Sequence, residues 1–408
     1  MTLKEQQRLE DAYVMHTFGR KPVELVSGQG MVVTDADGRS YLDFISGIGV
    51  ISLGHCHPAL VGAIREQAAR LMHVSNYYYI EHRGELAEQL STLLNSSLLE
   101  GEREPWQTFF ANSGAEANEC AIKLARIHAS KRAVADGRAA ARTVVTLEGS
   151  FHGRTLATLA ATAQPAKQEA FQPLPDGFVA TPVNDVAALE RLFAERGEGV
   201  CAVLLECIQG ESGVHPCSAE FLAAARRLTS QYGALLIFDE VQSGIYRCGT
   251  HPFAFQHFGI APDAVTMAKG LGGGFPLGAC SARARVAASF APGDHGSTFG
   301  GSSLAVRAAR TVLETIEREG IADNVTRTGA YLRSRLGEVP GVCEVRGRGL
   351  MVGADLDDGL DAFDIALRAL DAGLLINATG PRTLRFLPPL ICTNDDVDAL
   401  IGRLTTLL

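Results

Sequence analysis

Residues 234–280, ALLIFDEVQSGIYRCGTHPFAFQHFGIAPDAVTMAKGLGGGFPLGAC, decide both the fold class and the chemistry of this chain. The apolar run ALLIF ends in Asp239, and the run AVTMA ends at Lys269, which glycines follow. Short apolar runs of this kind are typical of strands that are buried on both faces. The stretch therefore predicts two buried strands, one ending in an acid and the other in a lysine.

This acid and this lysine suit one kind of cofactor chemistry. A lysine amine forms a Schiff base with an aldehyde, and a carboxylate keeps a pyridine nitrogen protonated so that the ring accepts electrons. Pyridoxal phosphate is a cofactor that uses both groups. Taken alone, an acid at a strand end is more often a cap, and a lysine is more often a surface charge. Other parts of the sequence are therefore needed to support a cofactor site.

The bulk composition indicates a globular protein of more than one domain. The 408 residues exceed a single ordinary core, and 46% are apolar while 20% are charged. A net charge of −9 argues against a nucleic-acid partner, which needs clustered Lys and Arg. No apolar run approaches the roughly 18 residues that cross a bilayer. The start, MTLKEQQRLEDAYV, does not resemble a signal peptide, and nine cysteines without a C-x-x-C pair favour reduced thiols, so we expect a cytoplasmic enzyme.

The order of patterns along the chain predicts an α/β fold with a smaller second domain. Residues 1–55 are expected to form an N-terminal helix and a hairpin, turning at Asp37-Gly38, that pack with the small domain. Residues 56–305 begin with a helix near Pro58 and then alternate short apolar strands with helices, which predicts a large domain with a mainly parallel sheet. Residues 306–408 are expected to form a small α+β domain. His55 and His57 lie two residues apart, but no third ligand follows at metal-site spacing, so we expect no metal.

The run Asn112-Ser113-Gly114-Ala115 is a candidate phosphate site. It lies between the apolar run TFFA and a helical pattern, and the free N–H groups and dipole at a helix start attract anions. Glycine permits close approach, and Ser113 adds a hydroxyl donor. The signal is weak on its own, but together with Asp239 and Lys269 it favours a bound cofactor phosphate.

Nine segments carry a family resemblance, in the family's order along the chain. They are LGHCHP, NSGAEANE, SFHGRT, IQGESGV, DEVQSG, AKGLGGGFPLGA, STFGG, RGRGLMVG and LRFLPPL. The chain resembles the class III aminotransferases, which are fold-type I enzymes that depend on pyridoxal phosphate. The resemblance implies a mainly parallel seven-stranded sheet in the large domain. It also implies that the glycines at 270–274 form a turn after the lysine, since G-L-G-G-G is a poor match to the dinucleotide fingerprint.

The resemblance assigns cofactor roles to individual residues. It implies that Lys269 carries the cofactor as a Schiff base and that Asp239 pairs with the pyridine nitrogen. Gln242 would hydrogen-bond the phenolic oxygen of the ring, and Phe151 would stack on the ring face. The groups that would hold the phosphate are Ser113, Gly114 and Ala115, with Thr298 supplied by the other subunit of a homodimer.

Substrate roles follow from the same resemblance. Arg154 would bind a carboxylate with its planar fork. Arg385 would bind the α-carboxylate of glutamate or 2-oxoglutarate, and Glu211 would pair with Arg385 when the donor carries its amine far from that carboxylate. Lys269, once freed, would move a proton between the substrate carbon and the cofactor carbon. The donor would leave as a carbonyl product, and 2-oxoglutarate would then take up the amino group.

Within class III the chain most resembles the acetylornithine aminotransferases. The segments that carry this finer resemblance are SGIGVISLGHCHP, MHVSNYYY and FHGRTLATLAATAQP. In ornithine δ-aminotransferases a tyrosine that binds the free α-amino end aligns with Ile48. An apolar side chain at that position suits an acylated amino group better than a free ammonium, because an unpaired buried charge is costly. N2-acetyl-L-ornithine is therefore the expected donor, with 2-oxoglutarate as acceptor, in a step of arginine biosynthesis.

Departures from the family's pattern keep other donors open. Cys207 replaces a usual proline, Tyr246 and Cys248 replace residues of G-R-T-G, and Ser302 and Ser303 replace residues of G-G-N-P-L. Succinylornithine, ornithine, 4-aminobutyrate, a diamine or an amine of secondary metabolism remain alternatives. A nicotinamide-dependent oxidoreductase would need the missing G-x-G-x-x-G fingerprint, and a catalytically inactive paralogue would tend to have lost the lysine or the acid.

Overall fold

Seven strands form the central sheet of the computed structural model, which describes residues 2–408. Their order across the sheet is β4-β12-β11-β10-β7-β5-β6, and all run parallel except β12, which is antiparallel to both of its neighbours. The prediction of a mainly parallel seven-stranded sheet is confirmed. The strands are β4 (Trp106–Ala111), β5 (Thr143–Leu147), β6 (Phe178–Thr181), β7 (Val200–Leu205), β10 (Leu235–Asp239), β11 (Ala264–Met267) and β12 (Gly278–Arg283).

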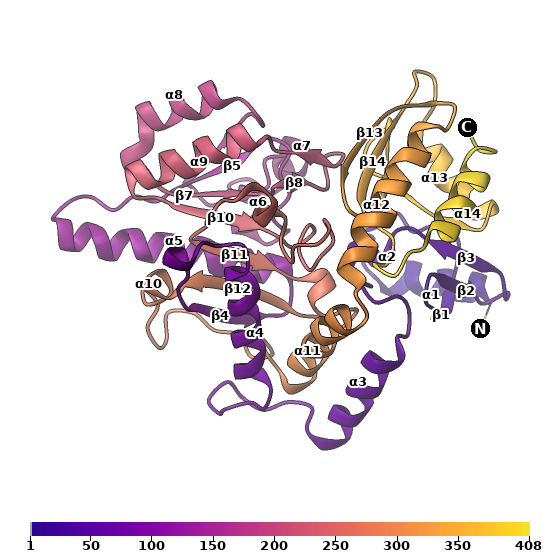
Figure 1. Cartoon of the computed structure of the whole chain (residues 1–408), viewed down its shortest axis with the longest axis horizontal. Helices are drawn as coiled ribbons and strands as arrows, with labels where there is room; N and C mark the ends of the chain where they lie inside the picture. The colour runs from indigo at the N-terminus through magenta and orange to yellow at the C-terminus, as the bar shows by residue number, and fades with distance from the viewer. Residues whose placement is uncertain (1) are drawn as a thin grey trace.

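Helices cover both faces of this sheet, because its central strands are apolar at successive positions. Leu235 and Ile237 of β10 pack in one cluster with residues of α5 (Gly114–Asp136). Leu236 and Phe238 pack in another cluster with residues of α9 (Ala219–Tyr232). Successive side chains of a strand point to opposite faces, so α5 and α9 lie on opposite sides of the sheet. In Figure 1, α8 (Val186–Arg196) lies next to α9 at the upper left.

A second lobe lies at the right of Figure 1. Its antiparallel sheet has the order β13-β14-β17-β16, and a further sheet, β1-β2-β3-β15, joins the two ends of the chain through a parallel pair of β3 with β15. The N-terminal segment therefore shares a sheet with the C-terminal region, while the domain boundaries at residues 55 and 305 stay a prediction. The elements of this lobe are β1 (Leu25–Gln29), β2 (Val32–Asp35), β3 (Ser40–Asp43), α12 (Ile321–Gly337), β13 (Val342–Arg348), β14 (Met351–Leu356), α13 (Ala362–Asp371), β15 (Leu374–Leu375), β16 (Asn377–Ala378), β17 (Thr383–Phe386) and α14 (Asn394–Leu404).

The N-terminal hairpin and the helix that follows it form where the sequence predicts. β2 and β3 pair antiparallel around Gly38, whose φ of 85° suits glycine, and α3 (Pro58–Arg70) begins at Pro58. His55 Nε2 lies 2.8 Å from Asp43 Oδ2, and Asp43 Oδ1 also accepts the backbone N–H of Ile45. His55 thus fixes the loop before α3, which gives it a structural role.

The remaining elements connect the lobes or flank the sheet. Within residues 2–408, no helix combines the length and apolarity that crossing a membrane requires. The elements are α1 (Leu3–Tyr13), α2 (Ser46–Gly49), α4 (Arg83–Asn95), α6 (Leu156–Ala161), α7 (Pro165–Gln168), β8 (Ile208–Gln209), β9 (His215–Pro216), α10 (Ala284–Ala287) and α11 (Ser303–Arg318), with short 3₁₀ turns at Glu100–Glu102, Glu169–Phe171, Gly197–Gly199, Ala254–Phe258 and Lys269–Leu271.

Candidate active site

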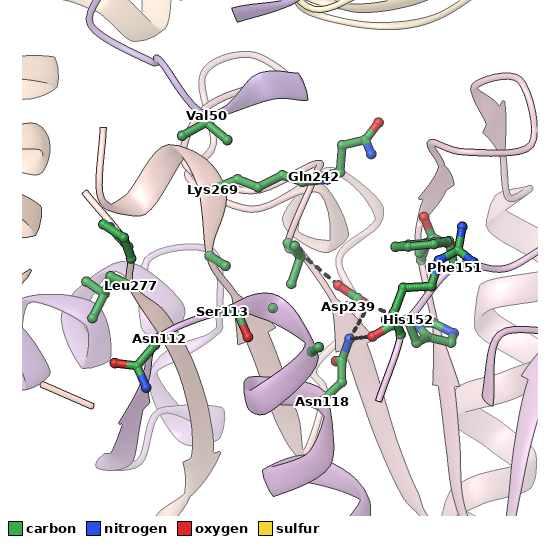
Figure 2. A pocket seen from close by; sticks show the side chains of 18 of the residues that line it. Val50, Asn112, Ser113, Asn118, Phe151, His152, Asp239, Gln242, Lys269 and Leu277 are labelled. Atoms are coloured by element: carbon green, nitrogen blue, oxygen red, sulfur yellow. Dashed lines mark hydrogen bonds and ion pairs between the residues drawn. The ribbon is translucent and has the colours of Figure 1, made fainter. Parts of the chain in front are cut away.

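A cavity of about 450 Å³ opens at the carboxyl ends of β10 and β11. The two strands are parallel neighbours, and Asp239 pairs in register with Thr266, so the acid and the lysine that follows β11 lie at the same edge of the sheet. Figure 2 shows Asp239 and Lys269 on the wall of this cavity. The other predicted site residues that line it are Ser113, Gly114, Ala115, Phe151, Arg154 and Gln242.

Lys269 begins a short turn directly after β11. Its backbone has a φ of 43°, in the left-handed region that side chains rarely adopt, and Gly273 and Gly274 of the same turn also have positive φ. The glycines at 270–274 therefore do form a turn, as predicted. Burial lowers the pKa of the Lys269 ammonium, an effect that Glu211 opposes and Arg385 reinforces. A lowered pKa makes the amine easier to deprotonate, which suits a nucleophile or a base.

Asp239 is held from several sides at the base of the cavity. It is only 3% exposed, and its Oδ2 accepts hydrogen bonds from Asn118 Nδ2 at 2.7 Å and His152 Nδ1 at 2.8 Å. Its Oδ1 accepts the backbone N–H of Val241 at 3.0 Å. These bonds fix the plane of the carboxylate, as Figure 2 shows by dashed lines. A buried acid held in this way keeps one orientation toward the cavity.

The N-terminus of α5 forms another part of the wall. Ser113 caps the helix by accepting the backbone N–H of Glu116 at 3.2 Å, and the helix continues for 23 residues. A Cβ on Gly114 would lie 2.7 Å from Val241 Cγ1, so only glycine fits there. The free N–H groups of the first turn and the helix dipole provide a site that suits a phosphate.

Glu211 and Arg385 form an ion pair, with Gln242 between them. Arg385 Nη1 lies 2.6 Å from Glu211 Oε1, although the two residues come from different lobes and Arg385 is only 2% exposed. Burial by itself raises the pKa of Glu211, but Arg385, together with Lys269 and Gln242, holds that pKa below its ordinary value. Gln242 donates to Glu211 at 3.1 Å and accepts from Arg385 at 3.2 Å. Its bond to a cofactor ring stays a prediction.

Phe151 and Arg154 lie on one side of the cavity. The guanidinium carbon of Arg154 is 5.6 Å from the centre of the Phe151 ring, a cation–π contact. Arg154 is exposed, and among residues 2–408 no carboxylate pairs with it. The backbone N–H of Phe151 donates to Glu206 Oε1 at 2.9 Å, which ties this loop to the end of β7.

Two predicted site residues lie outside this cavity. Thr298 is exposed and lines a separate cavity of about 980 Å³, together with His73 and Tyr77. Ile48 is 41% exposed, whereas its neighbour Val50 lines the first cavity. The roles predicted for Thr298 and Ile48 stay predictions.

Several residues of the site were not predicted from the sequence, although most of them lie inside the quoted motifs. Asn118 belongs to NSGAEANE, His152 to SFHGRT and Val241 to DEVQSG. Their types were visible, but only the fold shows which of them converge on Asp239. Further residues missed in this way are Glu206, next to the motif IQGESGV, and Thr266, which donates to Asn118 Oδ1 at 2.7 Å.

The structure shows where the five residues that depart from the family's pattern lie. Cys207 and Cys248 are fully buried, and Tyr246 has a φ of 61° in a turn closed by its N–H bonding Pro252 O at 3.0 Å. Ser302 caps α11, and Ser303 is buried in its first turn. None of the five residues lines the main cavity.

Comparisons with known proteins cover almost the whole chain. The sequence profile of the family "Aminotransferase class-III" matches residues 15–408. The chain is 45% identical over 403 residues to the acetylornithine aminotransferase of Caldanaerobacter subterraneus subsp. tengcongensis, covering 98% of each chain. It is 44% identical to that of Methanocaldococcus jannaschii, covering 97% of this chain and 96% of the relative. The crystal structure of N-acetylornithine aminotransferase from Stenotrophomonas maltophilia superposes with a TM-score of 0.81 at 38% identity, covering 98% and 97% of the two chains.

Proposed function

Because the chain belongs to the class III aminotransferase family, we propose that it transfers the terminal amino group of N2-acetyl-L-ornithine to 2-oxoglutarate. The products are N-acetyl-L-glutamate 5-semialdehyde and L-glutamate, which makes the reaction a step of arginine biosynthesis. The observation that carries the proposal is the near-complete match to acetylornithine aminotransferases, in a chain that places Lys269 and Asp239 in one cavity.

The enzyme uses pyridoxal phosphate, and the residues present fit that group. A buried carboxylate suits a protonated ring nitrogen, the N-terminus of α5 suits a phosphate, and Lys269 supplies a primary amine. Asp239 would face the ring nitrogen, and Ser113 with Gly114 and Ala115 would hold the phosphate. When bound, the cofactor supplies an aldehyde that accepts the amino group and a ring that withdraws electrons from the substrate carbon.

Lys269 is the group that moves protons. Lys269 lines the cavity, and its lowered pKa would let it take a proton from the amine-bearing carbon of the donor. Its Nζ would then deliver that proton to the cofactor carbon, so one side chain would act first as base and then as acid. Asp239, fixed by three hydrogen bonds, keeps its orientation at the base of the cavity throughout.

Arg154 and Arg385 would bind the carboxylates of different substrates: Arg154 that of the donor, and Arg385 that of the acceptor. Arg154 has no acidic partner within the described residues 2–408, and it can bind the α-carboxylate of the acylated donor with its planar fork. Arg385 is neutralised by Glu211 while the donor reacts. When 2-oxoglutarate enters, Glu211 would leave Arg385 so that the guanidinium binds the α-carboxylate of this acceptor.

A homodimer would complete the site. Tyr77, Tyr78, Tyr79 and Phe299 are large side chains that are each more than 60% exposed, which suits an interface between copies of this chain. Thr298, next to this surface, would then reach the phosphate of the partner's cofactor. Light scattering should give a dimer mass, and Thr298→Val should weaken cofactor binding by about threefold to tenfold through loss of one hydrogen bond. We also propose a cytoplasmic location, which nine free cysteines support.

A panel of amines with 2-oxoglutarate tests the donor. We expect glutamate to form fastest from N2-acetyl-L-ornithine, ahead of N2-succinyl-L-ornithine, ornithine, 4-aminobutyrate and diamines. If another amine has the highest kcat/KM, the donor is wrong while the aminotransferase activity stands. If the purified protein neither absorbs as a bound pyridoxal nor gains such a band on adding the cofactor, the chain is an inactive paralogue.

A further inference from the structure

A connected set of buried polar side chains surrounds Asp239 (Figure 2). We propose that His152 is a positioning residue for the cofactor's ring nitrogen, acting through Asp239, and that Asn118, oriented by Thr266, shares this task. The inference rests on the proposed function, because Asp239 needs a ring nitrogen to face. His152 is 2% exposed and belongs to the loop that also carries Phe151.

The hydrogen bonds assign a direction to this set. An ionised carboxylate only accepts, so His152 Nδ1, 2.8 Å from Asp239 Oδ2, carries the proton. Asn118 Nδ2 donates to the same oxygen at 2.7 Å, and Thr266 Oγ1 donates to Asn118 Oδ1 at 2.7 Å. The Thr266 bond fixes which end of the Asn118 amide faces the carboxylate. Asp239 Oδ2 is thus occupied by two donors, which prevents the carboxylate from rotating.

The backbone around His152 is fixed as firmly as its ring. Its N–H donates to Thr162 Oγ1 at 2.9 Å, and its carbonyl accepts from Asn118 Nδ2 at 2.8 Å. The next residue, Gly153, has a φ of 142°, and a Cβ there would lie 2.5 Å from Thr158 Oγ1. The imidazole therefore has one orientation, which directs Nδ1 at Asp239.

One nitrogen of the His152 ring and a second carboxyl complete the buried set around Asp239. His152 Nε2 is buried without a partner among residues 2–408, so a second proton on the ring would bury an unpaired N–H. The other carboxyl nearby is Glu206, whose pKa burial raises to about 7, with Asp239 reinforcing the shift and His152 opposing it. Below about pH 7, Glu206 is therefore mostly protonated in the folded protein.

Cofactor binding to the apo-protein tests this inference without relying on turnover. We would titrate pyridoxal 5'-phosphate into wild type and variants and follow absorbance for the Kd and for the pH midpoint of the bound band. His152→Leu removes the bond to Asp239, so we expect the Kd to rise about tenfold to a hundredfold and the pH midpoint to shift. His152→Asn keeps an amide donor near the position of Nδ1, and its Kd should stay within about threefold of wild type.

A matched control separates positioning from general destabilisation. His128 is a half-buried histidine of α5 whose Nδ1 bonds Ser289 Oγ at 2.8 Å, and it does not line the cavity, so His128→Leu should leave the Kd unchanged. A wild-type Kd in His152→Leu would contradict the inference, as would equal weakening by the Leu and Asn variants. If His152→Leu fails to fold, Thr266→Val decides by a raised or an unchanged Kd. Failure of the wild-type protein to bind the cofactor would instead refute the proposed function.

Discussion

The floor of the cavity, formed by Asp239, His152 and Asn118, and its rim, represented by Arg154, Ile48 and Thr298, are built in opposite ways. Floor residues are at most 3% exposed and bond one another, so a single chain completes this region. Rim residues are exposed, and Arg154 has no carboxylate partner among residues 2–408. The chain thus fixes internally the region proposed to hold the cofactor, and the region proposed to bind the substrate would be completed by a substrate or a second copy.

Lys269 lies between the two regions, and its loss should have the largest effect. Lys269→Ala removes the proposed covalent anchor and proton-transfer group, so we expect kcat to fall by about 10⁴-fold or more. Single-turnover and steady-state assays measure this fall in kcat, and circular dichroism is the control for folding. Near-normal turnover by the purified variant would end the assignment of Lys269 as the catalytic base.

The floor should be the next most sensitive region. Asp239→Ala leaves His152 and Asn118 without their acceptor and removes the carboxylate proposed to face the protonated ring nitrogen. Losing one partner of a buried charged pair costs about 3 to 5 kcal/mol. We expect kcat/KM to fall by about a hundredfold or more. Asp239→Glu, which keeps the charge, serves as the comparison. If both variants react as fast as wild type, the floor does not set the rate.

Glu206, a buried carboxyl near the floor, should make stability depend on pH. A buried carboxyl with a raised pKa is charged in the unfolded chain but protonated in the folded one, so folding loses stability as pH rises from about 4.5 to about 7. Glu206→Gln should therefore gain stability relative to wild type between pH 5 and pH 8, by up to about 3 kcal/mol. Urea unfolding of both apo-proteins at the two pH values measures this gain. A stability difference independent of pH would contradict it.

The rim should respond more mildly and mainly in binding. Arg154→Gln removes the charged group proposed to bind the donor's carboxylate, and we expect KM for N2-acetyl-L-ornithine to rise about tenfold while kcat changes less. Arg138→Gln, at an exposed site beyond the end of α5, provides a control with the same loss of charge. A large fall in kcat at constant KM would mean that Arg154 belongs functionally with the floor.

The sequence predicted the strands, the turn glycines and the pair of Asp239 with Lys269, because each of these features has a recognisable local sequence pattern. It missed His152 and Asn118, which lie 34 residues apart and meet only because the α5 face and the loop after β5 converge on β10. It placed Ile48 near the substrate from an alignment, whereas Val50 lines the cavity of the single chain. Local periodicity specifies elements, but convergence of side chains depends on sheet order and loop paths, which one sequence does not display.

The parallel pair of β3 with β15 has a consequence for synthesis. Leu42 pairs with Leu374, so the N-terminal hairpin cannot gain its last strand until almost the entire chain has left the ribosome. Closing so long a loop is slow, and an unpaired strand edge is prone to wrong partners meanwhile. The large sheet, whose strands all lie between residues 106 and 283, can assemble first. The sheet that contains the first strands to be synthesised is therefore among the last to be completed.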